Sequence, residues 1–236
     1  MEDTPRPLTD HLEELRRRCI RGILAVAAGT VLSYFFVDSI FLFLAKPIGS
    51  FVFLRPTDAF FARLKIALST GIIIAMPVLL LQIWKFIVVA LKPLERKSHF
   101  WILPTSYILF ILGFSFGFFL LVPLGVKFLL SYSSSVLHPL ISIDEYIDFI
   151  GVLCIALGAL FQSPLVTFFI ARFGFLQAKT LSKKRRIALL VIYVASAIVT
   201  PGPDPVTSFL LACSSYLLYE FSIWTATWGE RKYSLD

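Results

Sequence analysis

Six long apolar runs limit what this chain can fold into. Most of them match the roughly 17 to 25 residues that a helix needs to cross a bilayer. The runs are residues 20–37, 66–89, 100–127, 149–171, 187–200 and 206–223. Hydrophobic residues make up 58% of the chain, more than a water-soluble domain usually carries. We therefore predict an all-α membrane protein, with residues 1–236 forming a single polytopic domain of six transmembrane helices.

The predicted helices differ in length. The fifth, at about fourteen residues and ~21 Å, is shorter than a hydrocarbon core of ~30 Å, whereas the third reaches ~42 Å. The segment "TPGPDPV" at residues 200–206 explains short fifth and sixth spans. Its prolines and glycine stop one helix, and Asp204 before Pro205 is typical of the cap and first residue of the next. Either the third helix tilts or projects from the membrane, or the bilayer is thinner beside the fifth and sixth.

The positive charges predict the orientation of the chain. Sixteen of its 22 lysines and arginines lie in the amino terminus, the second loop, the fourth loop and the carboxyl tail. Lysine and arginine are enriched in the cytoplasmic loops of membrane proteins. Both termini are therefore predicted to be cytoplasmic, with residues 224–236 as a cytoplasmic tail. The net charge of +7 follows from this topology, and no basic domain suited to nucleic acid is present.

The amino-terminal segment "PLTDHLEELRRRCIRG", residues 7–22, predicts an amphipathic helix that runs into the first span. Glu13 with Arg17, and Glu14 with Arg18, have the spacing of helical ion pairs worth about 0.2 to 0.5 kcal/mol each. Such pairs need no further role. The alternative is that Glu14, close to the membrane surface, receives a cation from another molecule.

The loop after the second span raises the same choice for Glu95. In "FIVVALKPLERKSHFWIL", residues 86–103, it is the single acid. Four cationic or potentially cationic side chains surround it: Lys92, Arg96, Lys97 and His99. A surface carboxylate neutralised by these neighbours contributes only about 0 to 1 kcal/mol. A carboxylate held rigidly instead binds an incoming guanidinium through two parallel hydrogen bonds, which an ammonium does not reproduce.

Three segments together resemble the TatC family, the largest subunit of the twin-arginine protein translocase. They are "HLEELRRR" at 11–18, "IWKFIVVALKPLERK" at 83–97 and "TPGPDPVTSFLLACSSYLLYE" at 200–220. The resemblance covers nearly the whole chain. It implies that Glu14 and Glu95 recognise the paired arginines of a signal peptide on folded cargo. Phe86 and Arg16 match further residues tied to recognition, and Pro47 matches a structural proline of the first outer segment.

The resemblance also implies partners and an energy source. TatA-type and TatB-type single-span subunits are expected to dock on the fifth and sixth helices, and the chain is expected to form a homo-oligomer within a receptor complex. Export would be driven by the proton-motive force across a bacterial cytoplasmic (inner) membrane. Asp204 and Glu220 lie on these helices, and each also has a structural interpretation: a helix cap for the first and a surface ion pair for the second.

Gln162 lies inside the fourth span, ~21 Å from its outer end. A buried amide usually bonds a neighbouring helix, for about 0.6 kcal/mol, although Gln162 is also suited to line a polar cavity. Members of the TatC family often have an acid here, so the glutamine departs from the family pattern. Gly113 and Gly117 form a GxxxG pattern in the third span, which favours close helix packing.

Other function classes find little support. The sequence has no HExxH, GxSxG or P-loop motif, so no enzyme, cofactor or metal site is predicted. A small-solute transporter should have a polar pathway at mid-membrane, but Gln162 is nearly alone there, and no internal repeat or discontinuous helix pair is visible. A purely structural scaffold remains the third alternative, in which Glu14 and Glu95 are replaceable.

Overall fold

The computed structural model describes residues 8–45, 51–52, 54–89, 99–133, 140–200 and 204–233. Side chains are described for all of these except residues 8–12, 86–89, 99–100 and 231–233. Every regular element in these ranges is a helix, so the all-α class is confirmed. In chain order they are α1 (Leu8–Tyr34), α2 (Val37–Ala45), α3 (Asp58–Val89), α4 (His99–Phe116), η2 (Gly117–Leu121), α5 (Val122–Leu130), α6 (Ile143–Leu160), α7 (Ser163–Arg172), α8 (Ala178–Lys183), α9 (Arg185–Val199) and α10 (Pro205–Tyr233).

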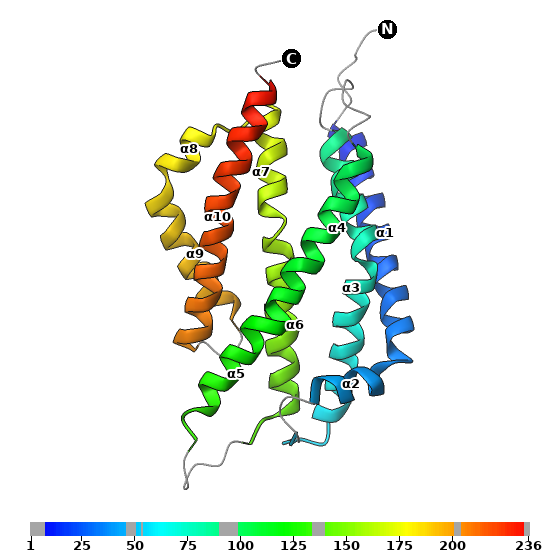
Figure 1. The fold of residues 1–236 in the computed structure, drawn as a ribbon. Coiled ribbons are helices and arrows are strands. Elements are labelled where there is room, and N and C mark those ends of the chain that lie inside the picture. Colours follow the sequence, from blue (N-terminus) through cyan, green and yellow to red (C-terminus); the bar gives the residue numbers. More distant parts are fainter. Residues whose placement is uncertain are drawn as a thin grey trace.

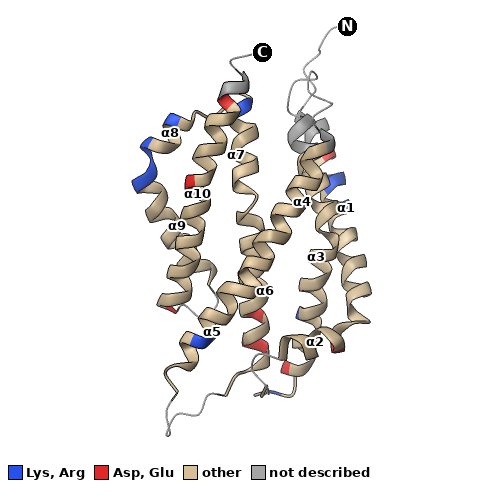
Figure 2. Ribbon diagram, viewed as in Figure 1, with Lys and Arg blue, Asp and Glu red and all other residues tan. Residues whose placement is uncertain are grey.

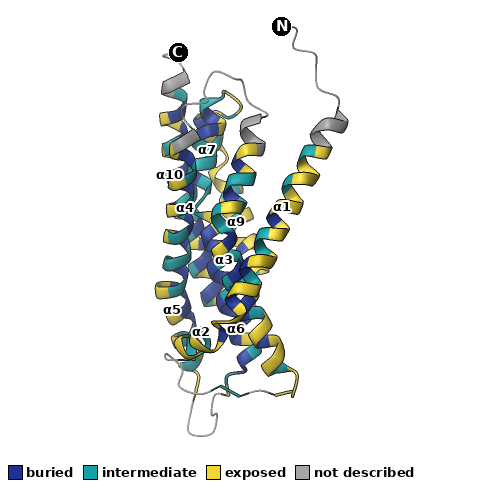
Figure 3. Cartoon of the chain, turned by 90° about the vertical axis from the view of Figure 1, so that its right-hand side faces the viewer, coloured by how far each residue is buried: buried dark blue, intermediate teal, exposed yellow. Residues whose placement is uncertain are grey.

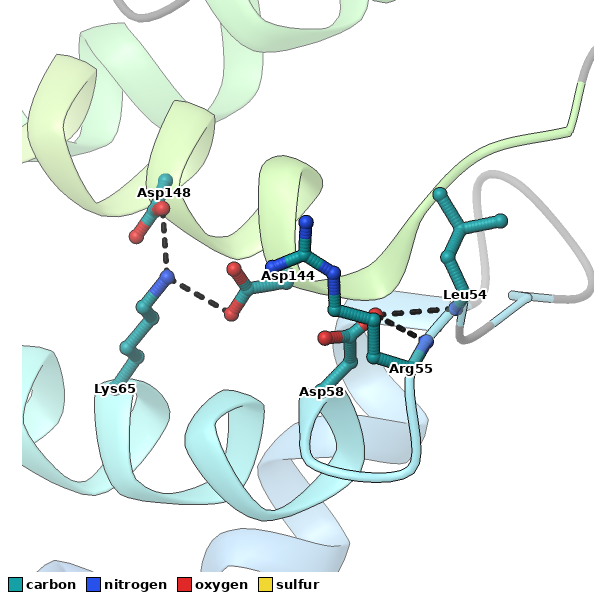
Figure 4. Close-up of polar contacts among 6 residues, drawn as sticks. All are labelled: Leu54, Arg55, Asp58, Lys65, Asp144 and Asp148. Atoms are coloured by element: carbon teal, nitrogen blue, oxygen red, sulfur yellow. Dashed lines mark hydrogen bonds and ion pairs between the residues drawn. The ribbon is translucent and has the colours of Figure 1, made fainter.

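Helix α1 joins the amphipathic segment and the first apolar run without a break, as predicted. At its end the chain turns by 75° into α2. Helix α3 begins at Asp58, eight residues before the predicted start at 66. The Asp58 carboxylate accepts hydrogen bonds from the backbone N–H groups of Leu54, at 3.0 Å, and Arg55, at 2.9 Å (Figure 4). These bonds fix the turn that leads into the helix.

The third span is one long helical path with a wider turn inside it. Helix α4 continues through the π-helix η2 into α5. The N–H of Val122 donates to the carbonyl of Gly117, five residues back, and Pro123 follows at the start of α5. Because proline has no N–H to donate, the regular bonding pattern changes most easily there. The predicted length is confirmed, with a candidate span of 30 residues from Trp101 to Leu130.

The fourth span differs from the uninterrupted helix expected at 149–171. It begins six residues earlier, at Ile143, and is interrupted at Phe161 and Gln162, between α6 and α7. Pro164, in the first turn of α7, removes one backbone donor at this point. Helices α6 and α7 together still count as one candidate span of 30 residues, Ile143–Arg172. This short break therefore does not contradict the expectation of no discontinuous helix pair of the transporter kind.

The last two spans differ in length from each other. Helix α9 has 15 residues, about 22 Å, so the short fifth helix is confirmed. Helix α10 has 29 residues, so the short sixth span predicted at 206–223 is wrong, and the helix includes most of the predicted tail. Ala226 is fully buried, and a Cβ on Gly229 would lie 2.6 Å from the carbonyl oxygen of Phe168. This close packing on α7 extends α10 beyond its most apolar part.

Four segments in the described part of the chain are long and apolar enough to cross a membrane: Asp58–Lys85, Trp101–Leu130, Ile143–Arg172 and Pro205–Glu230. The bent pair of α1 and α2 makes up to five. Helix α9 is too short to count by this measure. Six spans therefore remain a prediction.

The helices form two groups joined by a diagonal element. Helix α1 packs along α3, and α10 packs along α7, while α4 packs against α6 between them (Figure 1). The start of α1 and the end of α10 lie at the same end of the bundle (Figure 1). Leu153, Cys154 and Leu157 of α6 have no exposed area. Figure 3 shows α1 at the edge of the bundle with exposed residues along its length.

Candidate functional site

A polar recess lies where α1 meets the end of α3. It has a volume of about 380 Å³ and is lined by Glu13, Glu14, Arg17, Arg18, Arg21 and Lys85. Five of these residues come from three successive turns of α1. Lys85 is the last residue of the candidate span Asp58–Lys85. The recess therefore lies at one end of the membrane-crossing part of the protein, and Glu95 follows Lys85 ten residues later in the sequence.

The two neighbouring glutamates of the recess have different surroundings. Glu13 pairs with Arg17 at 2.6 Å, and both side chains are more than half exposed. Glu14 pairs with Arg18, whose side chain is only 12% exposed. Arg18 also donates to the backbone carbonyl of Gln82 on α3, at 3.3 Å. Both i, i+4 pairs considered from the sequence are present, and Glu14 belongs to a contact between two helices.

Other residues of the expected recognition site lie partly outside the described residues. Arg16 is exposed on α1. The backbone of Phe86 belongs to α3, but its side chain lies outside the described residues, as do Glu95 and Pro47. The structure therefore places Glu14 at the end of α3. That Glu14 and Glu95 belong to one recognition site stays a prediction.

An apolar groove adjoins the polar recess and runs along α1 and α3. We call it the α1–α3 groove. Its volume is about 820 Å³, and its lining includes Leu15, Gly22, Val26, Val31, Leu68 and Ile83. Arg18 and Gln82 belong to its polar end. The sequence predicted no groove here, because the apolar residues of the two helices are indistinguishable in composition from any lipid-facing stripe.

Gln162 bonds a neighbouring helix. Its side-chain N–H donates to the Ser106 carbonyl of α4 at 2.9 Å, and its amide oxygen accepts from the Ser106 hydroxyl at 2.6 Å. The Trp84 indole N–H of α3 donates to the same hydroxyl at 3.0 Å. The network ties three spans together at the interruption of the fourth. Its polar groups are used within the protein, as the structural interpretation of Gln162 expects.

Asp204 caps α10, as predicted. Its carboxylate accepts the N–H of Thr207 at 2.7 Å, and Pro205 is the first helical residue. Glu220 forms an ion pair with Arg185 of α9 at 2.9 Å and accepts a hydrogen bond from Tyr216 at 3.0 Å. Both residues therefore have structural contacts, and Glu220 holds the start of α9 against α10.

Two polar contacts were missed from the sequence. Lys65 of α3 lies 2.8 Å from an Asp144 oxygen and 2.7 Å from an Asp148 oxygen of α6 (Figure 4). Glu230 of α10 accepts the N–H of Ala178 at 2.6 Å, at the start of α8. The spacing of Asp144 and Asp148 is visible in the sequence, but nothing local indicates which cation faces them.

The cations are distributed unevenly along the bundle. Figure 2 shows cations on α8 and on the upper part of α1, and acids on α6 and near α2 at the opposite end, although α5 also carries a cation there and α10 carries acids near the upper end. The arrangement agrees with the side on which the sequence places most lysines and arginines, the side of the two termini.

Comparisons with known proteins agree on one family. The family model for "Sec-independent protein translocase protein (TatC)" matches residues 10–213. The TatC protein of Carboxydothermus hydrogenoformans is 37% identical over 243 residues, covering 98% of this chain and 100% of the relative. The TatC protein of Aquifex aeolicus is 36% identical, covering 96% and 97%. A crystal structure of the twin-arginine translocase receptor TatC matches with a TM-score of 0.85 at 35% identity, covering 93% of this chain and 99% of that chain.

Proposed function

Because the chain belongs to the TatC family of Sec-independent protein translocase proteins, we propose that it is the receptor subunit of a twin-arginine translocase. It binds the twin-arginine signal peptides of folded cargo proteins at its cytoplasmic face. Glu14 and Glu95 accept the two arginines, Phe86 supplies apolar contact, and Arg16 lies beside the site. The polar recess, which contains Glu14 and Lys85 at the end of the span that precedes Glu95 in the sequence, is the observation that carries this proposal.

The chemistry of recognition follows from the carboxylates. A carboxylate has about four acceptor positions and takes a guanidinium through two parallel bonds. The Glu14 side chain is 30% exposed, so the contact with Arg18 does not enclose it. In this proposal an incoming arginine binds the exposed part of the Glu14 carboxylate, and the pair with Arg18 keeps the carboxylate in place. Such positioning reduces the side-chain ordering that binding costs.

The partners belong to the other group of helices. TatA-type and TatB-type single-span subunits dock on α9 and α10, near Asp204 and Glu220. Exposed apolar residues on these helices support this part: Leu190, Val194, Ile198, Phe209 and Leu217. Several copies form the receptor complex in a bacterial inner membrane, with both termini in the cytoplasm, and the proton-motive force drives export.

Peptide binding tests the proposal. The detergent-solubilised protein is titrated with an Arg-Arg signal peptide and its Lys-Lys version. Losing a charge-assisted bond costs about 1.5 to 3 kcal/mol, or about 10-fold to 100-fold in Kd, so wild type should prefer Arg-Arg by about that factor. Glu95→Gln and Glu14→Gln should each reduce the preference.

Glu13→Gln is the matched control, because Glu13 is the neighbouring acid of the same helix and its pair is exposed. It should leave the preference unchanged. Equal binding of both peptides to wild type, or an equal loss with Glu13→Gln, would contradict the proposal and favour a general cationic attraction.

A small-solute transporter gains no support from the structure. A transporter requires a polar pathway at mid-membrane, where the sequence offers little besides Gln162, and that side chain is bonded to Ser106. No group of three or more metal-binding side chains occurs within the described ranges.

A further inference from the structure

The α1–α3 groove and the polar recess form one continuous surface. The groove is lined almost entirely by apolar side chains, and Arg18 belongs to the lining of both. From Cys19 to Val31 the groove follows α1 for about 18 Å, close to the depth of one leaflet of a ~30 Å hydrocarbon core. An apolar groove of this length with a polar end has the dimensions of a lipid acyl chain below its headgroup.

The polar end carries an excess of positive charge. Four cationic side chains and two carboxylates line the recess. Glu13 and Glu14 pair with Arg17 and Arg18, so two cations of the recess remain, Arg21 and Lys85. Neither has an ion pair with an acid among the residues that the structure describes. Both are exposed, and long cationic side chains at such a depth extend toward the headgroup region.

We propose that the α1–α3 groove and the polar recess bind one anionic phospholipid, with an acyl chain in the groove and the headgroup phosphate on Arg21 and Lys85. The lipid lies in the leaflet on the side of the amino terminus. A phosphate oxygen accepts charge-assisted hydrogen bonds from both cations. The bound lipid also fills the space beside α1, which stands at the edge of the bundle (Figure 3).

The proposed paired arginines bind at Glu14, whereas the lipid phosphate binds at Arg21, about two turns further along α1. The shape of the groove distinguishes a lipid from a partner helix. A single-span helix needs a broad face with small residues for close contact. Among the residues of the groove, Gly22 already faces Leu79 of α3, with a Cβ position 3.1 Å from the leucine side chain. A flexible acyl chain can follow the uneven surface of the groove, and it brings no charge that Arg21 and Lys85 would repel.

Lipid binding to the purified full chain tests the proposal. Native mass spectrometry in detergent measures the affinities for phosphatidylglycerol and for zwitterionic phosphatidylcholine. Each basic residue near an anionic headgroup contributes about 1 kcal/mol, so wild type should bind phosphatidylglycerol at least about 10-fold more tightly. The double variant Arg21→Gln/Lys85→Gln should remove this difference. The matched control is Lys179→Gln/Lys183→Gln, two cations of α8 on the same side of the protein, which should keep it.

A second variant tests the apolar half. Ala27→Trp places a large side chain in the groove, where Ala27 contributes to the lining, and leaves every charge in place. It should weaken phosphatidylglycerol binding, and glycerol 3-phosphate should not compete, because it has no acyl chain. Equal affinity for the two lipids in wild type, or an unchanged preference in Arg21→Gln/Lys85→Gln, would show an exchangeable lipid annulus only. Displacement by glycerol 3-phosphate would reduce the site to a phosphate contact and overturn the role of the groove.

Discussion

At the scale of single residues, burial and partners separate side chains that look alike in the sequence. Glu13 and Glu14 are neighbours in one motif, yet only the pair of Glu14 includes a cation that also bonds α3. Thr105 and Ser106 are neighbours in α4. The Thr105 hydroxyl bonds its own helix, at Trp101, whereas the Ser106 hydroxyl joins Trp84 and Gln162 from two other helices. Function and stability therefore depend on which of two adjacent side chains faces the interior.

Ser106→Ala should destabilise the protein. The variant leaves the Trp84 indole N–H and the Gln162 amide oxygen without this partner, although the bond from Gln162 to the Ser106 carbonyl remains. Interhelical hydrogen bonds in membrane proteins average about 0.6 kcal/mol, with a maximum of about 1.7. The free energy of unfolding in detergent should therefore fall by about 1 to 2 kcal/mol.

Thr105→Val is the control, because valine has nearly the same shape and the lost bond lies within one helix. It should change the free energy of unfolding by less than about 0.5 kcal/mol. Equal effects of the two variants would mean that the network around Ser106 contributes no more than an intrahelical hydroxyl.

At the scale of helices, close contacts decide where elements cross and end. Helices α1 and α3 cross at Gly29 and Gly71, where an added Cβ on Gly71 would lie 2.5 Å from the backbone nitrogen of Thr30. Helix α10 is held on α7 by Gly229 and Ala226. The small residues allow approaches that larger ones prevent, which is how packed membrane helices gain contact without a hydrophobic driving force between them.

Gly71→Ala should force α1 and α3 apart. The neighbouring atoms belong to the backbone and hydroxyl of Thr30, so they have little freedom to move, and overpacking of this kind costs about 1 to 3 kcal/mol. Thermal unfolding in detergent measures the loss. Gly22→Ala is the control on α1, because its added Cβ meets only the flexible end of Leu79 at 3.1 Å. It should unfold close to wild type, and a Gly71→Ala variant that did the same would show that the crossing adapts.

The Lys65 cluster should stabilise the contact between α3 and α6. Lys65→Ala leaves Asp144 and Asp148, one helical turn apart, to repel each other. The three side chains are 31% to 45% exposed, so the loss should stay near 1 kcal/mol. Replacing both acids by asparagine in the Lys65→Ala background should restore part of the lost free energy of unfolding.

Arg63→Ala is the control for Lys65→Ala, because Arg63 lies near the same end of α3. Arg63 pairs with Asp38, and both side chains are more than half exposed. Its loss should be below about 0.5 kcal/mol, since exposed pairs contribute little. A loss with Arg63→Ala as large as that with Lys65→Ala would mean that sharing one lysine between two acids has no special effect.

At the scale of the whole molecule, the chain returns to the end of the bundle where it began (Figure 1). Among the residues that the structure describes, most of the lysines and arginines lie toward that end. Helix α9 packs beside α10 but has 15 residues against the 29 of α10. A thinner bilayer is therefore now expected beside α9 and no longer beside the full length of α10.

Both termini should be cytoplasmic. In a variant whose three cysteines are replaced, a cysteine is introduced at Ser234 or at Thr57. In intact cells a membrane-impermeant thiol reagent should label Thr57→Cys, which is exposed before α3, and should label Ser234→Cys only after the membrane is opened. The reverse pattern would invert the predicted orientation and place the polar recess on the wrong side for a cytoplasmic signal peptide.

The sequence by itself determined the features that depend on neighbouring residues. Apolar runs identify the membrane helices, the spacing of Glu14 and Arg18 predicts their ion pair, and Asp204 before Pro205 predicts the start of α10. The three family motifs are also continuous in the chain. Each of these signals acts within a few turns of helix, so composition and spacing are enough to find it.

Only the tertiary structure decided the features that join distant segments. The interruption of the fourth span lies beside Ser106 of another helix. Helix α10 extends along α7, where Gly229 packs closely against it. Lys65 pairs with Asp148, which lies 83 residues later in the chain. The α1–α3 groove exists because two antiparallel helices cross at Gly29 and Gly71. These outcomes depend on which helix faces lie against each other, and many arrangements of the same apolar faces are compatible with one hydropathy pattern.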